Sequence, residues 1–252
     1  MNTNYTIVMN LNITKIKGIH QFGKVPLLTG IACLLAISIS SCTKSSNTTN
    51  TNLPYGILSV VYAAPDGPAA DFYINNSLVN TSALTYGNYI PYFRLTTGTN
   101  KAGFFDTGSL TTIAIDSINI KVNQVYTLFF PNLVAKRDFL LTTDTLVAPP
   151  NGGASIRLAN MSPNAPNVDL MIGGKVIVSN KSYKQVSSFT AIPVSGNDTL
   201  KIVQTGTSNV LGVVNAVTVQ SEGVYTVWLY GLVNGTNGQG LNANLMQNAL
   251  FN

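Results

Sequence analysis

The sequence has few charged residues, a single histidine and two cysteines. Charged residues make up 9% of its 252 positions, against about 25% in a typical globular protein. Asn, Thr, Ser and Gly fill the polar positions instead, as in many exported β-rich proteins, where turns need Asn and Gly and strand faces accept Thr. The hydrophobic content of 45% is enough for packed cores, so general disorder is not expected.

The shortage of histidine and cysteine excludes whole classes of site. His20 and Cys33 both precede Cys42. A chain cut before Cys42 would keep one cysteine and no histidine, which excludes an internal disulfide, a catalytic dyad built on histidine and an ordinary zinc site. Only one glutamate, Glu222, follows Cys42, and no nucleophile elbow or phosphate loop is present. We therefore expect a non-enzymatic protein without metal or cofactor.

The positive charge also gives little support for nucleic-acid binding. Three of the 14 basic residues, Lys15, Lys17 and Lys24, precede Cys42, which leaves 11 against nine acidic residues. Those 11 are scattered, and no run of them would neutralise a row of phosphates. We expect no nucleic-acid partner.

The first 41 residues have the features of an export signal. Residues 1–24 carry three lysines and no acid, and residues 25–39 are almost continuously apolar. Fifteen residues suit a signal core and fall short of the ~20 needed to span a bilayer as a helix. Ile39-Ser40-Ser41-Cys42 then resembles the bacterial lipobox. That resemblance implies cleavage before Cys42 and lipid on its sulfur; the alternative is an uncleaved membrane helix.

The segment after Cys42 is predicted to be a flexible tether. Residues 42–53 are polar and of low complexity, with no apolar face to bury. Thr43 stands where an aspartate would resemble the signal that retains lipoproteins in the inner membrane. We therefore expect a lipid-anchored protein of the bacterial cell envelope, held in the outer membrane, with its periplasmic or surface orientation open.

Two segments of the chain match each other at an offset of 98 residues. Residues 58–76 and 156–174 share an apolar strand, a Pro-x-x-Pro-x-x-Asp frame and an alternating strand that leads to a turn. The matching residues of the frame are Pro65, Pro68 and Asp71 with Pro163, Pro166 and Asp169. Residues 125–128 and 224–227 match at an offset of 99. We interpret these as tandem domains, 54–147 and 154–252, joined by a Pro/Gly linker at 148–153.

Each copy reads as short strands rich in Val, Ile, Tyr, Phe and Thr, separated by Gly, Asn or Pro. In the first copy the expected strands are 57–63, 71–75, 89–95, 101–105, 111–118, 125–130 and 137–142. In the second they are 154–161, 168–172, 186–193, 199–204, 211–219, 224–230 and 240–250. About seven strands per copy predict an all-β protein of two antiparallel, immunoglobulin-like β-sandwiches, with a barrel as the alternative.

The Pro-x-x-Pro-x-x-Asp frame resembles that of a bacterial family known as domain of unknown function 4397. Residues 64–68 and 162–166 carry the likeness, which covers about residues 55–250. The resemblance implies an envelope protein with a β-sandwich fold and supplies no activity and no catalytic residues. Asn164 departs from the acidic residue of the family's frame, and Tyr62 and Asn160 stand where members often have histidine.

The repeated frame is more readily explained by structure than by ligand binding. Its prolines would stiffen a crossover between strands, and Asp71 and Asp169 would accept hydrogen bonds from loop N–H groups. The alternative, a calcium site, needs six to eight oxygen ligands, and the second copy offers only Asp169 there. Tyr126 and Tyr225 each open a strand and resemble the tyrosine corner of Greek-key sandwiches.

Aromatic residues gather in two places and suggest a glycan platform. Tyr89, Tyr92 and Phe93 lie close together in the first copy, and Trp228 and Tyr230 alternate on one face of a strand in the second. If that face is not part of the core, it would stack on sugar rings. Our main hypothesis is a lipid-anchored binding, adhesion or scaffold protein with an envelope protein or glycan as partner. The alternative is an accessory glycan-binding lipoprotein that uses these exposed aromatics.

Overall fold

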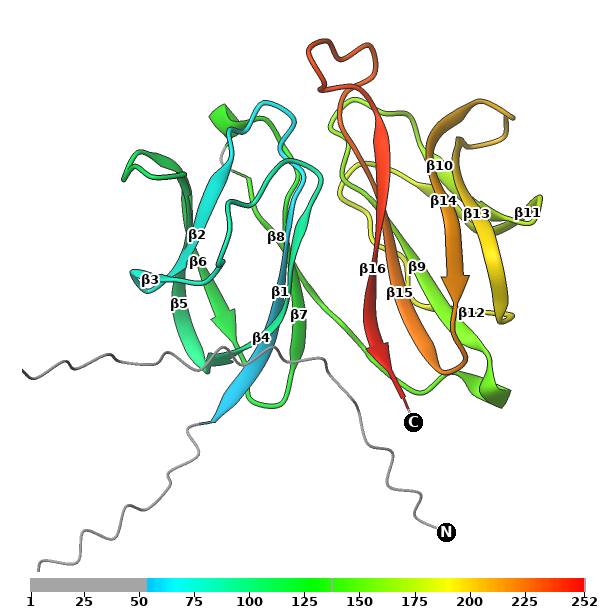
Figure 1. The fold of residues 1–252 in the computed structure, drawn as a ribbon, viewed down its shortest axis with the longest axis horizontal. Helices are drawn as coiled ribbons and strands as arrows, with labels where there is room; N and C mark the ends of the chain where they lie inside the picture. Colours follow the sequence, from blue (N-terminus) through cyan, green and yellow to red (C-terminus); the bar gives the residue numbers. More distant parts are fainter. Residues whose placement is uncertain (1–53, 137, 252) are drawn as a thin grey trace, which may run out of the picture. The chain divides into compact units, whose positions relative to one another are not determined.

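The computed structural model describes residues 54–136 and 138–251, whose fold Figure 1 traces. The predicted signal 1–41, the lipidation residue Cys42 and the tether 42–53 lie outside the described residues. Within those ranges, no helix is long and apolar enough to cross a membrane. The regular secondary structure of the described residues is nearly all β-strand, with two short 3₁₀ helices, which confirms the all-β prediction.

Repeat 1 consists of strands β1 to β8, coloured blue to green in Figure 1. Its strands are β1 (Tyr55–Tyr62), β2 (Ala70–Ile74), β3 (Ser77–Leu78), β4 (Tyr89–Thr96), β5 (Gly98–Asp106), β6 (Thr112–Ile120), β7 (Val125–Phe130) and β8 (Leu140–Thr143). They form two four-stranded sheets, in the orders β4-β1-β7-β8 and β3-β2-β5-β6. A short 3₁₀ helix, Val134–Lys136, lies between β7 and β8.

Repeat 2 has the same plan. Its strands are β9 (Ala154–Asn160), β10 (Val168–Ile172), β11 (Lys175–Lys181), β12 (Thr190–Ile192), β13 (Ser195–Gln204), β14 (Val210–Val219), β15 (Gly223–Tyr230) and β16 (Asn242–Leu250). The sheet orders are β12-β9-β15-β16 and β11-β10-β13-β14, which repeat those of the first copy strand for strand. A 3₁₀ turn at Pro150–Gly152 precedes β9 within the predicted linker.

Each repeat is a β-sandwich with its own core. The buried cluster of repeat 1 draws side chains from both of its sheets, among them Leu58, Phe72 and Phe104. A separate buried cluster does the same in repeat 2, with Leu158, Leu170 and Val227 among its members. The sandwich prediction is therefore confirmed. The sheets are antiparallel except at the pairs β1–β7 and β9–β15, which are parallel.

The sheets are of two kinds, which differ in whether one or both faces of their central strands are buried. Strand β2, with its alternating burial, covers a core on one face only, as the two-residue period of a strand dictates. Every residue of β9 and β15 is buried. The sheet that holds these two strands, and its counterpart β4-β1-β7-β8, contact the other repeat and are called junction sheets here; the remaining two are called outer sheets.

The change of offset from 98 to 99 residues has a local cause in β14. Ala102 pairs with Asp116 in repeat 1, and Leu200 pairs with Val214 in repeat 2, so the offset is still 98 on both strands. The next matching pairs are Asn100–Ile118 in repeat 1 and Asp198–Val217 in repeat 2. Between β5 and β13 the offset is still 98, but between β6 and β14 it has become 99. The extra residue is a β-bulge, in which Ala216 has a φ of +55°.

Both predicted tyrosine corners are present. The hydroxyl of Tyr126 accepts a hydrogen bond from the backbone N–H of Lys121 at 3.3 Å. The hydroxyl of Tyr225 accepts one from the N–H of Gln220 at 2.9 Å. Tyr126 lies in β7 and Tyr225 in β15, and each of these strands belongs to a junction sheet. Each hydroxyl holds the backbone of the residue five positions earlier in the chain. The resemblance to Greek-key sandwiches therefore extends to this contact.

All fourteen expected strands overlap observed ones, and two strands were missed. β3 has only two residues, and β11 contains two lysines and an asparagine among its seven. Each forms a hairpin with the strand that contains the frame aspartate: β3 pairs with β2, which holds Asp71, and β11 pairs with β10, which holds Asp169. Short edge strands with polar side chains carry little of the apolar alternation from which strands are predicted.

Candidate functional site

A buried ion pair joins the two repeats. Asp144 follows β8 of repeat 1, Arg157 lies in β9 of repeat 2, and Nη1 of Arg157 is 2.7 Å from Oδ1 of Asp144. The two side chains are 0% and 3% exposed, so water screens their attraction little. Such a pair is stable only where its remaining donors and acceptors also find partners.

The carboxylate of Asp144 accepts several hydrogen bonds from repeat 1. The hydroxyls of Tyr92 and Thr127 each donate to Oδ2 at 2.5 Å. The hydroxyl of Thr142 lies 3.4 Å from Oδ1, at the long end of hydrogen bonding. Together with Arg157 these groups use both carboxylate oxygens.

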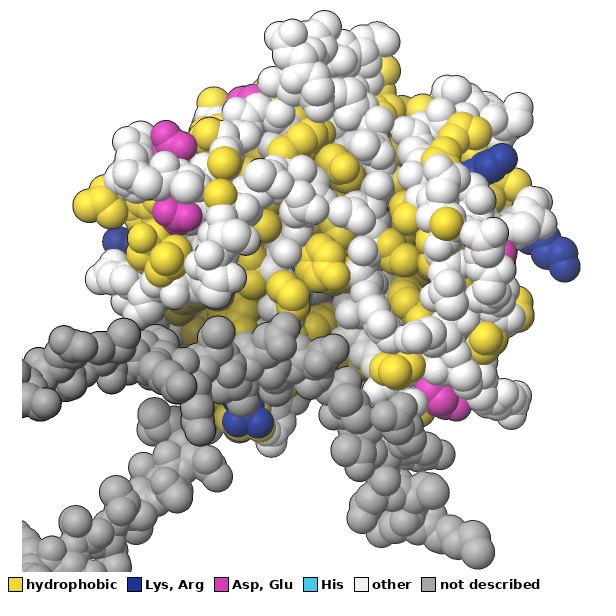
Figure 2. Space-filling view, in the orientation of Figure 1, with side chains coloured by type: hydrophobic (Ala, Val, Ile, Leu, Met, Phe, Trp, Pro, Cys, Tyr) yellow, Lys and Arg dark blue, Asp and Glu magenta, His cyan; other side chains and the backbone are white. Residues whose placement is uncertain are grey.

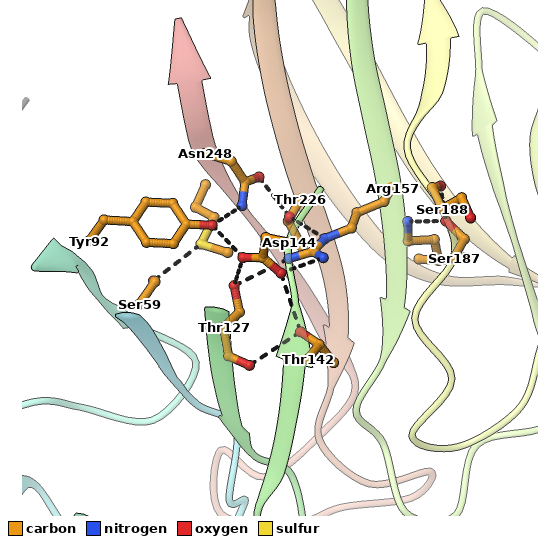
Figure 3. Close-up of polar contacts among 12 residues, drawn as sticks. Ser59, Tyr92, Thr127, Thr142, Asp144, Arg157, Ser187, Ser188, Thr226 and Asn248 are labelled. Carbon is orange, nitrogen blue, oxygen red and sulfur yellow. Dashed lines mark hydrogen bonds and ion pairs between the residues drawn. The ribbon is translucent and has the colours of Figure 1, made fainter. Parts of the chain in front are cut away.

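The guanidinium of Arg157 is held equally well, as Figure 3 shows. Its Nε donates to the hydroxyl of Thr226 at 2.8 Å, and Nη2 donates to that of Thr127 at 3.2 Å. Thr226 in turn donates to the side-chain oxygen of Asn248 at 2.7 Å. The amide nitrogen of Asn248 donates to the hydroxyl of Tyr92 at 2.7 Å, which closes the circuit. We call Tyr92, Thr127, Asp144, Arg157, Thr226 and Asn248 the junction network.

Equivalent positions of the two repeats lie in and around this network. The register of the strands identifies the equivalent pairs. They are Ser59 and Arg157, Tyr92 and Phe189, Thr127 and Thr226, and Asp144 and Asn248. The junction therefore resembles a two-fold interface in which the same patch is used on both sides. The charges are not symmetric, because repeat 1 supplies the acid, Asp144, and repeat 2 the base, Arg157. The junction face of one repeat is therefore complementary in charge to that of the other.

The position of Tyr92 favours its neutral form. Burial raises the pKa of its phenol above the ordinary value, and the negative charge of Asp144 raises it further. The pKa of Tyr62 is raised in the same way, first by burial and then by Asp66. Both hydroxyls therefore keep their protons and act as hydrogen-bond donors.

These tyrosines predict loss of stability in alkali. In the unfolded chain a tyrosine loses its proton near pH ~10, whereas the folded pKa values of Tyr62 and Tyr92 are higher. The folded state then holds more protons than the unfolded state, so the free energy of unfolding should fall as pH rises above ~10 and be unaffected by these groups below it. Urea unfolding on both sides of that pH, with tyrosinate absorbance as the probe, measures this. Reversible ionisation of all tyrosines without unfolding would contradict it.

The predicted aromatic platform is buried at the junction. Trp228 is 0% exposed and Tyr230 8%, and both belong to a cluster with Val61, Phe129 and Met246 that draws on both repeats. The ring of Tyr89 meets that of Trp228 edge to face at 5.8 Å. The sequence allowed this strand face to be either part of the core or an exposed aromatic platform. The structure shows that it is buried, so the prediction that Trp228 and Tyr230 are exposed was wrong.

Tyr92 and Phe93 do not add to a platform either. They are neighbours on β4, and strand alternation directs them to opposite faces. Tyr92 belongs to the junction network, whereas Phe93 packs against the core of repeat 1. The structure therefore brings Tyr89, Trp228 and Tyr230 together, assigns Tyr92 to a polar role and separates Phe93 from all of them.

The charged pair of the junction, Asp144 and Arg157, was not predicted from sequence. Arg157 is the one charge in an otherwise apolar and small-residue strand, β9, and a lone charge at such a position calls for a buried partner. Thr127 and Thr226 stand at equivalent positions of the repeat. The lone arginine and the repeated threonine can both be seen in the sequence. Nothing in the sequence connects them with Asp144, because that contact is made only by tertiary packing.

A cavity of about 470 Å³ opens beside Arg157, between the two repeats. Its lining combines Arg157, Phe189 and Val186 of repeat 2 with Val147. Five hydroxyl side chains complete the lining, namely Thr142, Thr143, Thr145, Ser187 and Ser188. The guanidinium carbon of Arg157 lies 4.7 Å from the centre of the Phe189 ring, which stacks on it. We call this cavity the junction pocket.

A second hollow, of about 420 Å³, lies on the outer sheet of repeat 2. Its floor is apolar, with Met171, Val203 and Val210, and Lys201 and Asp198 lie at its edge. In repeat 1 the residues equivalent to Met171 and Val203 are larger, Tyr73 and Phe105, whose rings meet edge to face at 5.2 Å. The outer sheets thus differ between repeats. Of these two cavities, the junction pocket is the one lined by residues of both repeats.

The Pro-x-x-Pro-x-x-Asp loops have the same internal contacts in both repeats. Oδ1 of Asp66 accepts a hydrogen bond from the N–H of Val134 at 2.8 Å. Oδ1 of Asn164 accepts the equivalent bond from Val233, also at 2.8 Å. Asparagine thus replaces the acidic residue of the frame without loss of this contact, which needs only a carbonyl-type oxygen.

The frame aspartates fix neighbouring loops and have different environments. Asp169 is 7% exposed and accepts from the N–H of Asn180 at 2.7 Å and the hydroxyl of Thr205 at 2.6 Å. Asp71 accepts longer bonds, 3.4 Å from Thr107 and 3.3 Å from Gly108. The predicted role as acceptors of loop hydrogen bonds agrees with these contacts.

Asp169→Ala should destabilise the protein by about 1–3 kcal/mol, because it removes a buried acceptor of two short hydrogen bonds, from Asn180 and Thr205. Asp71→Ala is the matched control, and its effect should be smaller, since its bonds are longer and its side chain more exposed. Urea unfolding of both variants measures the difference. Equal losses would contradict the assignment.

The described ranges 54–136 and 138–251 contain no group of three or more His, Cys, Asp or Glu side chains that could hold a metal ion. Charged side chains are few and scattered on the face that Figure 2 shows, which is mostly hydrophobic and uncharged polar. A second ion pair, Lys184 with Asp138, is about one-third exposed on each side.

One family model matches the chain. It is described as Domain of unknown function (DUF4397) and matches twice, over residues 56–171 and 154–247. The two matches agree with the tandem copies inferred from the repeat. Among curated proteins no match was found.

Several solved structures show weak similarity. One is CBMbc, of family CBM26, from Eubacterium rectale Amy13K in complex with maltoheptaose, with a TM-score of 0.26 and 12% identity over 76% of this chain and 96% of that one. Another, described as alpha-glucan binding by a streptococcal virulence factor, has a TM-score of 0.23 and 11% identity over 70% and 92%. The glycogen-degrading pneumococcal virulence factor SpuA gives 0.24 and 10%, over 68% of this chain and 20% of that chain. Similarities at these TM-scores carry no argument about function.

Proposed function

The chain belongs to the DUF4397 family, and from that premise we propose that it is a non-catalytic binding protein of the bacterial cell envelope, anchored by lipid on Cys42. The observation that carries the binding role is the junction: two sandwiches share one buried network with a pocket beside it. Sites between domains are common places for ligands.

The groups around the junction pocket support binding over catalysis. The nearest carboxylate, Asp144, is neutralised by Arg157 and accepts hydrogen bonds from Tyr92 and Thr127. A general base needs a free lone pair within reach of its substrate, and this carboxylate has its oxygens engaged. The pocket's other polar groups are hydroxyls without an adjacent base to activate them.

The lipid anchor is tested by labelling. Cells grown with palmitate that carries a clickable group should incorporate it into the wild-type chain and not into Cys42→Ser, because the thioether needs the sulfur. Fractionation should place the labelled chain in the outer membrane. Recovery of a wild-type chain that still has residues 1–41 and no label would refute the anchor.

The binding role is tested by cosedimentation of the protein with isolated envelope fractions. Ser188→Trp places a large side chain at the rim of the junction pocket and should abolish cosedimentation. Ser117→Trp, at an exposed position on β6 of the outer sheet of repeat 1, is the matched control and should bind normally. Equal binding by both variants would exclude the pocket as the site.

A glycan-binding form of this function needs a site other than the one predicted from sequence. Trp228 and Tyr230 are buried, so they offer no ring face to a sugar. The junction pocket has the only ring that lines either of the two cavities described above, that of Phe189.

A further inference from the structure

The junction pocket is rich in hydroxyl groups. Thr142 and Ser187 use theirs in hydrogen bonds to the protein. Thr143, Thr145 and Ser188 are exposed and form no side-chain hydrogen bond within the described ranges. A hydroxyl both donates and accepts, so these three groups suit a ligand whose own groups do the same.

The pocket has no net charge. Arg157 and Asp144 compensate each other at 2.7 Å, and none of the other lining residues is charged. An anionic ligand would gain little from a guanidinium that is already paired. An uncharged ligand does not disturb the pair and can still accept from an N–H of Arg157 that the network leaves unused.

One ring gives the pocket an apolar wall. Phe189 is half-buried and lines the cavity, and its ring stacks on the guanidinium of Arg157. Aromatic surface of this kind packs against the C–H groups of a sugar ring, while polar groups placed around it fix the orientation.

The polar wall is held rigidly before any ligand arrives. Arg157 is fixed by Asp144, Thr226 and Thr127, as Figure 3 shows. A site whose groups are already ordered loses less entropy on binding. A volume of about 470 Å³ lies within the range of roughly 300–1,000 Å³ typical of small-ligand sites.

We propose that the junction pocket binds a sugar unit of a neutral glycan, with Phe189 beneath the ring and Thr145, Ser188 and Arg157 on its hydroxyls. This inference rests on the proposed binding function and names its ligand class. It differs from the platform predicted from sequence, since none of Tyr89, Trp228 and Tyr230 lines the pocket.

The test uses isothermal titration calorimetry of the whole chain with defined oligosaccharides. Maltoheptaose, cellohexaose and xylohexaose represent neutral chains, and an oligogalacturonate represents acidic ones. At least one neutral chain should bind, and more tightly than the acidic one. The double variant Thr145→Val/Ser188→Ala should weaken binding about tenfold, because each lost hydrogen bond is worth about 0.5–1.5 kcal/mol.

The matched control is Thr218→Val/Ser117→Ala, which makes the same chemical changes at exposed positions that line neither cavity. It should bind as the wild type does. Equal affinity of the two double variants would overturn the site, and preference for the oligogalacturonate would overturn the neutral class.

Failure of this inference and failure of the proposed function give different results. If no oligosaccharide binds but cosedimentation with envelope fractions is still blocked by Ser188→Trp, the pocket is a binding site for another ligand and the glycan class is wrong. If cosedimentation is also absent, the binding function itself is wrong.

Discussion

Asp144→Ala is expected to destabilise the protein by about 3–5 kcal/mol, the usual result of removing one partner from a buried ion pair. The variant leaves the guanidinium of Arg157, whose side chain is 3% exposed, without its counterion. It also removes the acceptor of Tyr92 and Thr127. Urea unfolding followed by the fluorescence of Trp228, the only tryptophan of the chain, measures the loss at the junction itself.

The double variant Asp144→Leu/Arg157→Met is the control for that experiment. It replaces both charges by apolar side chains of similar size, and such replacements of buried pairs are often neutral or stabilising. We expect it to recover most of the stability that Asp144→Ala loses. A loss of less than about 1 kcal/mol in Asp144→Ala, as for an exposed pair, would show that the junction is open to water in solution.

Trp228→Ala should also cost about 3–5 kcal/mol, since it empties a large volume in a packed interior. The side chain is 0% exposed and contacts both repeats through the cluster around Val61, Phe129 and Met246. Its loss should therefore weaken the contact between the repeats as well as repeat 2. Urea unfolding by circular dichroism is the appropriate measurement, because the variant has no tryptophan.

Trp228→Phe separates the volume of this side chain from its polarity. Within the described residues the indole N–H donates no hydrogen bond, so phenylalanine removes a buried donor and breaks no contact of that kind. We expect a clearly smaller loss than in Trp228→Ala. Equal losses in the two variants would mean that volume at this position is not what stabilises the junction.

The features found correctly from sequence are those encoded within one repeat. The strand pattern, the frame around Pro65 and Pro163 and the two tyrosine corners depend on residues close to each other in the chain. The family assignment depends on the same frame. The slip in offset was visible from sequence, but its form, a bulge at Ala216, required the pairing of β13 with β14.

The candidate site was not found from sequence, because no local pattern marks it. Asp144 and Arg157 are only 13 residues apart, yet they belong to different repeats and face each other only when the junction sheets pack. Tyr92 and Asn248, which close the network, are separated by 156 positions. A polar network of this kind depends on which surfaces meet, and the repeat gave no indication that the surfaces of two complete sandwiches would do so.

The sequence by itself determined the all-β class, the tandem repeat and the position of most strands, because the period of a strand and the residues of a turn are local properties. Only the tertiary structure decided which strand faces are buried. Apart from Thr226, β15 is apolar or aromatic on both faces, and both faces are buried, one against its own sandwich and the other against the other repeat. Alternation cannot distinguish a second buried face from an exposed aromatic shelf, since both require the same residues, and the contact between the repeats makes that distinction.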